Sequence, residues 1–441
     1  MPLRIIRKDD LPKPIDEPKK QEEQPIVDFI ENKFLPDDKE FINQCPVAIK
    51  LYNLFEHKLP TTGHVAVTVA SALASICVKN IDRQFNFVFG APPGQGKTKL
   101  LEQFCGLTWL VNYMNRTTYA DYMLMYCGRF VKKIGREVPW GVKYDKRLKV
   151  QHLIDTSDAP DFITNRFDII SEGESIFTTS DLPKLIQLWN ALLEEGYYKG
   201  GDRYSGHYQI GSPSNRVRHG LILASTIEHF NRHVLVDAGW STRCILGVYC
   251  NTDEENEFIR YGLRHNLIGD DPTFHLDVKR LLNHLLPDHP VSVEYDNDEI
   301  PDMLKRCEDN LKVIRREIPG IRATKDVKRF VKGFAWLNGY RKVKYYHVVF
   351  VDALIQSLCR RLQLDDNSNS YKDLGSRLHF QVALRKSMLQ DEDKVVKSIL
   401  DTFKFWKNDE SLYSVDSIKL AIRELGMPVE PIVRPKQVKF A

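Results

Sequence analysis

Residues 91–98, Ala-Pro-Pro-Gly-Gln-Gly-Lys-Thr, constrain the fold of this 441-residue chain more than any other feature of its sequence. They follow an apolar run at residues 85–89 that predicts a short strand ending at Gly90, and a helical pattern begins near Lys97. Glycines at positions 94 and 96 let the backbone amides curl around an anion. A strand, a glycine-rich turn and a helix in this order predict a phosphate-binding loop.

The residue types in this loop suit a nucleoside triphosphate with its metal ion, so ATP and Mg²⁺ are the expected cofactors. Lys97 would reach the β- and γ-phosphates, and the hydroxyl of Thr98 would ligate Mg²⁺. A tight glycine turn without a ligand is the alternative. The predicted ATP-binding residues are Pro93, Gly94, Gln95, Gly96, Lys97, Thr98 and Lys99.

Strands and helices are expected to alternate along the middle of the chain. Further apolar runs predict strands at residues 167–170, 221–224 and 244–249, with helices between them such as residues 182–195. This alternation favours an α/β fold with a mainly parallel sheet and helices on both faces. From residue 253 to residue 361 the pattern becomes helical.

Composition shifts along the chain suggest its domain organisation. The charged, proline-containing N-terminus predicts a flexible tail, and the polar run Asp-Asp-Asn-Ser-Asn-Ser-Tyr-Lys-Asp near residue 365 marks a boundary. The expected units are a tail (1–24), a helical segment (25–80), an ATPase core (81–252), a helical lid (253–364), a linker (365–390) and a winged-helix-like domain (391–441).

Charge and cysteine content exclude few function classes. The chain has 63 Lys and Arg against 59 Asp and Glu, a net charge of +4 that neither requires nor excludes nucleic acid. Eight scattered cysteines without a Cys-x-x-Cys pair argue against a zinc site and suit a reducing compartment. No apolar run approaches the roughly 18 residues of a membrane span, and no signal peptide is evident. We therefore expect a cytoplasmic protein without membrane contact.

Acidic residues follow the predicted strand at 167–170, in the run Ser171-Glu172-Gly173-Glu174. ATP hydrolysis needs a carboxylate at the end of a neighbouring strand to orient water or hold Mg²⁺. Glu172 is the first candidate for both roles and Glu174 the alternate, whereas Asp168 lies on the strand itself. A solvent-facing acidic turn without catalytic function is the other interpretation.

Two further positions have the chemistry of a γ-phosphate site. The predicted strand at 221–224 ends in Ser225-Thr226, where a hydroxyl could hydrogen-bond the attacking water. Arg243 interrupts a stretch of small and apolar residues just before the next strand. Its guanidinium could act as an arginine finger on a neighbouring subunit, and a structural ion pair is equally consistent with the spacing.

These motifs together resemble the AAA+ ATPases, and most closely the ATPase module of minichromosome maintenance (MCM) helicases, in a divergent form like that of mobile-element or viral replication. The resemblance implies a three-layer αβα core in a ring of subunits, such as a hexamer. The implied roles are Walker A (Lys97, Thr98), Walker B (Glu172), sensor 1 (Thr226 or Ser225), arginine finger (Arg243) and sensor 2 on the lid (Arg322). Ser171 departs from the family, because an Asp is expected there, and sensor 1 lacks the usual Asn.

Basic and aromatic residues alternate in the segment 197–218, which resembles the hairpin that these ATPases insert before sensor 1. Such a composition suits phosphate contacts and base stacking along a DNA strand, and a solvated loop is the alternative. The predicted DNA-binding residues are Lys199, Arg203, Tyr204, His207, Arg216 and Arg218. At the C-terminus, residues 414–426 predict a helix capped by Ser414, as in a helix-turn-helix.

The sequence therefore favours an ATP-driven DNA translocase or helicase that works as a ring. One alternative is an AAA+ ATPase that remodels a protein partner. Another is a non-motor switch that binds DNA under nucleotide control, since Ser171 in place of Asp suits slow hydrolysis.

Overall fold

The computed structural model describes a large part of the chain, and the flexible tail expected at residues 1–24 lies outside that part. Arg203 and Tyr204 also lie outside it. The described residues are 43–119, 131–133, 136–138, 142–145, 150–153, 165–177, 182–202, 206–214, 216–227, 243–251, 253–265, 268–269, 271–315, 321–358, 377–389, 391–403 and 414–425.

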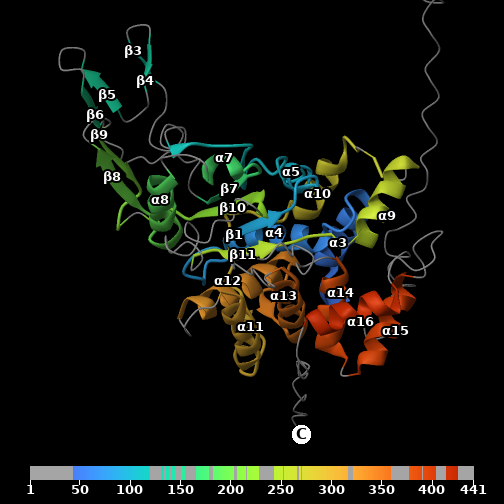
Figure 1. The fold of residues 1–441 in the computed structure, drawn as a ribbon. Helices are drawn as coiled ribbons and strands as arrows, with labels where there is room; N and C mark the ends of the chain where they lie inside the picture. Colours follow the sequence, from blue (N-terminus) through green and yellow to red (C-terminus); the bar gives the residue numbers. More distant parts are fainter. Residues whose placement is uncertain are drawn as a thin grey trace, which may run out of the picture.

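The centre of the molecule is a five-stranded parallel sheet flanked by helices (Figure 1), which confirms the expected α/β fold with a parallel sheet. The strand order is β11-β1-β10-β7-β2, and every neighbouring pair is parallel. The strands are β1 (Phe87–Ala91), β2 (Val111–Met114), β7 (Arg166–Ile170), β10 (His219–Thr226) and β11 (Ile245–Val248).

One boundary around the phosphate loop differs from the sequence expectation. Strand β1 does not stop at Gly90 but continues to Ala91, because both residues pair with β10. Helix α5 (Lys97–Glu102) begins where expected and ends after six residues. Beyond it, the amides of Gln103, Phe104 and Cys105 bond carbonyls three residues back. This tighter winding ends the helix early and leads the chain into β2.

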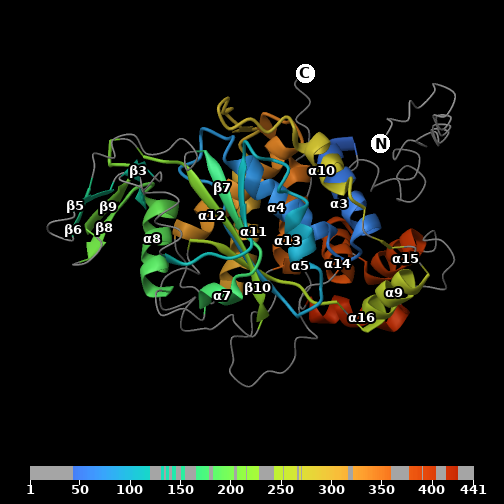
Figure 2. The same ribbon diagram turned by 90° about the horizontal axis from the view of Figure 1, so that it is seen from above.

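Helices cover both faces of the sheet (Figure 2). One face packs against α4 (Gly63–Ser75), α5 and α13 (Tyr345–Leu358), and the other against α8 (Leu182–Glu194). Side chains alternate along the strands, so Phe87 and Phe89 of β1 join the first apolar cluster, whereas Val88 joins the second with Trp189 of α8. The apolar runs of these strands are therefore buried on both sides, as parallel sheets require.

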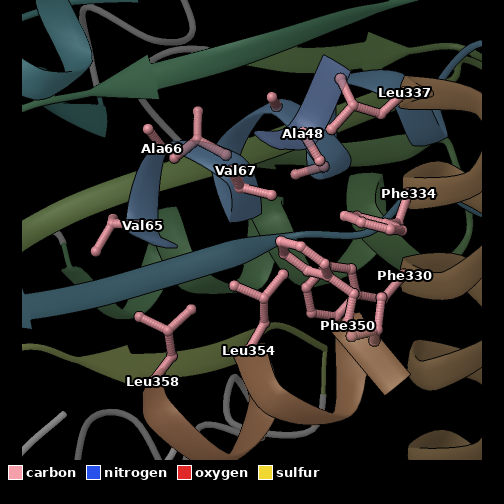
Figure 3. Close-up of a cluster of buried hydrophobic side chains, with 14 of the residues drawn as sticks. Ala48, Val65, Ala66, Val67, Phe330, Phe334, Leu337, Phe350, Leu354 and Leu358 are labelled. Atoms are coloured by element: carbon pink, nitrogen blue, oxygen red, sulfur yellow. The ribbon is translucent and has the colours of Figure 1, made fainter. Parts of the chain in front are cut away.

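Helix α4 forms the middle of the larger cluster, and all 13 of its residues are buried. Helix α12 (Ile321–Leu337) packs along it so closely that a Cβ on Gly333 would lie 2.6 Å from the Ser71 carbonyl oxygen. Phe85 stacks on Phe330 with ring centroids 4.4 Å apart. Figure 3 shows this cluster, in which phenylalanines of α12 and α13 meet small side chains of α4.

Six further helices in the described part of the chain add buried residues to the same cluster. They are α3 (Pro46–Lys58), α10 (Phe274–Leu282), α11 (Ile300–Arg315), α14 (Arg377–Met388), α15 (Glu392–Phe403) and α16 (Val415–Glu424). None of the described residues of α9 (Asp253–Arg264) belongs to the cluster. Buried residues from α3 through Leu425 belong to one apolar cluster, across the expected units 25–80, 81–252, 253–364 and 391–441. Helix α14 occupies residues 377–388, where a linker was expected.

The expected N-cap of α16 is confirmed, because the Ser414 hydroxyl accepts a hydrogen bond from the Ser417 amide at 3.1 Å.

Antiparallel hairpins project from one end of the sheet, at the left of Figure 1. The expected hairpin before β10 consists of β8 (Tyr198–Asp202) and β9 (Gly206–Ile210). Two more hairpins in the described residues, which the sequence analysis did not predict, lie between β2 and β7. They are β3 (Val131–Lys133) with β4 (Arg136–Val138), and β5 (Val142–Asp145) with β6 (Val150–Leu153). Strand β6 lies beside β9.

Candidate functional site

The phosphate loop leaves the sheet at the carboxyl end of β1, which lies between β10 and β11. From β1 the chain first builds β2, β7 and β10 on one side and then crosses over to β11 on the other. Open α/β sheets bind ligands in the crevice outside the carboxyl ends of the strands, where the strand order reverses in this way. The fold therefore places residues 92–98 at the position where a ligand is expected.

The loop turns at two glycines whose backbone conformation other residues rarely adopt. Gly94 and Gly96 have φ angles of 80° and 76°, in the left-handed region that favours glycine. A Cβ atom on either residue would meet nothing within 4 Å, so the space over the loop is open. The Lys97 side chain is buried, and its Nζ donates to the carbonyl oxygens of Ala91 at 3.2 Å and Pro92 at 3.4 Å. A phosphate could take the place of these carbonyls, so the residues fit the predicted ligand.

The other predicted loop residues surround this lysine. Thr98 is half-buried at the start of α5, whereas Pro93 and Lys99 are exposed. Two hydrogen bonds from the segment after β11 fix Gln95. Its backbone carbonyl accepts from the Tyr249 hydroxyl, and its side-chain Oε1 accepts from the backbone N–H of Asn251 at 2.9 Å. Burial raises the pKa of Tyr249, which keeps this hydroxyl protonated as a donor.

The predicted water-orienting residues lie at the same edge of the sheet. The β1–β10 register aligns Thr226 with Ala91 and Ser225 with Gly90. Among the described residues, the buried Ser225 hydroxyl has no hydrogen-bond partner. The structure thus brings the end of β10 directly beside the start of the phosphate loop.

The acidic turn after β7 reaches this edge as well. The Gly173 amide donates to the Ala224 carbonyl at 2.7 Å, which holds the turn against β10. Glu172 is exposed, and its amide donates to the Asn115 carbonyl at 2.8 Å. Glu174 begins the short helix α7 (Glu174–Phe177) and is half-buried. Both glutamates therefore stay candidates by position.

Asp168 lies apart from this edge, as its place on the strand predicted. Its Oδ2 is 2.9 Å from Nε2 of His219, and both side chains are fully buried between β7 and β10. Asn112 of β2 donates to its other oxygen at 3.3 Å. Asp168 is a structural group of the sheet.

Arg243 and Arg322, the predicted arginine finger and sensor 2, lie together at the opposite, amino edge of the sheet. Arg243 precedes β11, and its Nε is 2.7 Å from Oε2 of Glu194 at the end of α8. Arg322, at the start of α12, places a terminal nitrogen 3.2 Å from the other oxygen of the same carboxylate. Within one chain the structure therefore does not bring either arginine to Lys97.

More arginines gather at this amino edge, where they bond backbone carbonyls. Arg83 donates from Nε to the Glu194 carbonyl at 2.6 Å, and Arg218 donates to the Val78 carbonyl at 2.7 Å. Burial lowers the pKa of both guanidinium groups, and the nearby positive charge of Arg216 lowers that of Arg83 further. The amino edge therefore carries positive charge on guanidinium groups that hydrogen bonds to backbone carbonyls hold in place.

The predicted DNA-binding residues occupy different environments. Lys199 on β8 and Arg216 before β10 are exposed, whereas Arg218 is half-buried and holds a backbone carbonyl. For His207 on β9 the structure describes the backbone alone. Arg203 and Tyr204 lie outside the described residues. Lys199 and Arg216 are thus the predicted contacts that the structure shows at the surface.

Sequence reasoning missed the groups that organise these two edges. Glu194 ends an amphipathic helix, and no motif distinguishes it from its neighbour Glu195. Asn251 and Thr61 lie in connecting segments beside other polar residues, such as Thr62 after Thr61. Their roles depend on contacts between residues 156 and 190 positions apart.

Comparison with protein-family models and with curated proteins found no match for this chain. Among the described residues, no three or more His, Cys, Asp and Glu side chains form a group that could hold a metal ion. A magnesium nucleotide does not need such a group, since Mg²⁺ is held by one or two protein ligands plus phosphates and water. No described helix is long and apolar enough to span a bilayer.

Proposed function

We propose that this protein binds and hydrolyses ATP with Mg²⁺ at the phosphate loop, as an AAA+-type ATPase. The observation that carries the proposal is the open loop around Gly94 and Gly96, with Lys97 behind it, at the carboxyl edge where β1, β10 and β7 end. Three residue types that phosphoryl transfer uses meet there: a lysine, a hydroxyl at Thr226 and a carboxylate at Glu172.

In this proposal, different residues bind the phosphates, hold the metal ion and orient the attacking water. Lys97 exchanges the carbonyls of Ala91 and Pro92 for phosphate oxygens, and the loop amides donate to the same group. Thr98 and Glu172 would hold Mg²⁺, which neutralises charge on the phosphates when it is bound. Glu172 also orients the attacking water, with Thr226 donating or accepting a hydrogen bond beside it.

The amino-edge arginines support a site shared between subunits. Arg243 and Arg322 lie on the side of the sheet away from Lys97, so they would reach a γ-phosphate only on a second copy of the chain. A ring joins the edge of one subunit to the opposite edge of the next, as a head-to-tail interface requires. We therefore propose a homo-oligomeric ring with a site completed in trans.

DNA is the proposed substrate, on which the ring would act as a translocase or helicase in the replication of a mobile element or virus. The β8–β9 hairpin presents exposed Lys199, and Arg216 lies exposed where the chain returns to β10. Such positive side chains bind the nucleic-acid backbone, and a hairpin next to the sheet can move when the nucleotide changes.

Ser171 favours a second candidate, a nucleotide-dependent DNA-binding switch without motor activity. This buried side chain occupies the place of the expected Walker B Asp, and its hydroxyl lies 3.4 Å from Oδ1 of Asn115. A neutral hydroxyl holds Mg²⁺ less tightly than a carboxylate, since Mg²⁺ prefers charged oxygen ligands. Slow hydrolysis would suffice for such a switch.

The test is steady-state ATP hydrolysis with Mg²⁺, with and without single- and double-stranded DNA, compared with Lys97→Ala. Stimulation by DNA that disappears in the variant supports the motor. Turnover that no DNA changes contradicts the translocase and points to an AAA+ ATPase with a protein client. ATP binding without turnover supports the switch.

A further inference from the structure

We propose that Thr61, Tyr249 and Asn251 are positioning residues that hold the phosphate loop in the shape that receives a nucleoside triphosphate. The inference rests on the proposed ATP binding and extends it to residues outside the loop motif. It follows from a continuous set of hydrogen bonds, part-buried at Gln95 and buried at Thr61, that joins the loop to the helices before the sheet.

The loop needs an external support because its own residues give it freedom. Gly94 and Gly96 both have positive φ, and glycine adopts several backbone conformations at similar cost. The peptide between them belongs to Gln95, which is fixed at both its carbonyl and its side chain by Tyr249 and Asn251. These two contacts select one loop shape out of those that the glycines allow.

Asn251 is in turn held by Thr61. The Thr61 hydroxyl donates to Oδ1 of Asn251 at 2.7 Å, and the two side chains are 1% and 8% exposed. Water has little access to this contact, so the loss of the hydroxyl would leave a buried acceptor unsatisfied. This hydrogen bond fixes the Asn251 side chain, and with it the backbone N–H of Asn251 that donates to Gln95.

Thr61 reaches Asn251 from an unusual backbone conformation. Its φ is 73°, a region that β-branched residues rarely occupy. The buried carboxylate of Glu56 maintains this conformation, since it accepts from the amides of Thr61 at 3.1 Å and Gly63 at 3.0 Å. Such strain persists when its surroundings determine it, and it is common near functional sites.

Asn165, the other described non-glycine residue with a positive φ, offers a contrast. Asn165 has a φ of 61° in the turn before β7, where its amide donates to the Arg218 carbonyl. Asparagine tolerates this region, so that turn requires no special support. Threonine does not tolerate this region of φ. The strained backbone of Thr61 therefore occurs at the residue whose hydroxyl bonds Asn251.

The test measures the dissociation constant of Mg·ATP and the kcat of hydrolysis for matched variants. Thr61→Val keeps the shape of the side chain and loses the hydroxyl, and Tyr249→Phe loses the donor to Gln95. We expect each to weaken ATP binding about fivefold to tenfold, as one buried hydrogen bond predicts, with kcat changed less than twofold. Thr61→Ser, which keeps the hydroxyl, should bind ATP within about twofold of the wild type.

Tyr52→Phe is the matched control, because it removes another buried hydroxyl from the same core. Its hydroxyl accepts from Gln381 of α14 at 2.9 Å, a residue outside the set of hydrogen bonds that fixes Gln95. Thermal unfolding of all variants separates loop positioning from loss of fold. If Thr61→Val and Tyr249→Phe bind ATP like Tyr52→Phe, while Lys97→Ala binds less, the inference fails and the ATP site stands. If the wild type binds no ATP, both fail.

Discussion

At the scale of single residues, the proposed binding of a nucleotide depends most on Lys97. Its Nζ donates to the carbonyl oxygens of Ala91 and Pro92, and each of these hydrogen bonds is replaceable by a charge-assisted bond to phosphate. We expect Lys97→Ala to weaken ATP binding by roughly 10- to 100-fold, as the loss of hydrogen bonds to a charged group predicts. Equilibrium titration with a fluorescent ATP analogue measures this change.

Lys99→Ala is the control for this substitution. Lys99 lies two residues further along, carries the same charge and is exposed. Equal losses in the two variants would mean that general positive charge, and not the loop, attracts the nucleotide.

The two glutamates after β7 are distinguishable by turnover. Glu172 is exposed directly behind the end of the strand, whereas Glu174 belongs to the first turn of α7. We expect Glu172→Gln to lower kcat by about 10²- to 10⁴-fold, the usual range for a general base, with ATP binding retained. Glu174→Gln should lower kcat less than threefold. Single-turnover hydrolysis checks both, and the reverse order would assign the role to Glu174.

At the scale of elements, two ion pairs of the Asp82 carboxylate, with Arg329 and Lys325, fix α12 to the segment before β1. Burial alone would raise the pKa of Asp82, but the hydrogen bonds and charges of Arg329 and Lys325 lower it from 3.8 to about 2. A carboxyl with a lowered folded-state pKa stabilises the fold above its unfolded pKa, and this contribution disappears as pH falls through about 2.

Asp82→Asn should therefore lower the thermal midpoint at pH 6. The difference from the wild type should stay constant down to about pH 4 and shrink between pH 4 and pH 2. Melting curves at these values measure it. A difference that does not change with pH would mean that the charge of Asp82 contributes nothing to this contact.

The β8–β9 hairpin and the residues after it predict a salt dependence. Lys199 and Arg216 are exposed, so each can neutralise one phosphate and release the counterions bound to it. We expect Lys199→Ala or Arg216→Ala to reduce the slope of log K against log salt by about 0.7 each for single-stranded DNA. Fluorescence anisotropy between 50 and 200 mM salt is the measurement, and the control is Lys50→Ala, an exposed lysine on α3 at the other side of the molecule. An unchanged slope contradicts the DNA contact.

Sequence patterns predicted the elements whose signal is local. The apolar runs at β1, β7, β10 and β11 and the turn chemistry at Gly94 and Gly96 are visible in short windows. The hairpins between β2 and β7 carry no strong alternation and escaped prediction. Arg243 and Arg322 both contact Glu194, and Arg322 lies 128 positions from Glu194 in the chain. No rule of sequence spacing predicts a contact over that separation. The support of Gln95 by Asn251 is hidden for the same reason.

At the scale of the whole molecule, the two edges of the sheet predict complementation between subunits. Lys97→Ala removes the lysine of the phosphate loop at one edge, and Arg243→Ala removes an arginine at the other edge. Each variant should therefore hydrolyse ATP at least about 10²-fold more slowly. A mixture should recover activity, because some interfaces combine an intact loop with an intact arginine. Turnover of the mixture at fixed total protein is the measurement. Activity equal to the mean of the separate variants would contradict a shared site.

The packing of α4 against α12 has a consequence for synthesis of the chain. All residues of α4 are buried, yet its principal partner begins at Ile321, about 250 residues after α4 ends. At about 5–20 residues per second, translation needs roughly 12–50 seconds to cover that distance. During this interval an apolar helix emerges without the surface that later covers it. We therefore expect production of the intact protein to depend on chaperones that bind nascent chains, and to improve when translation between α4 and α12 is accelerated.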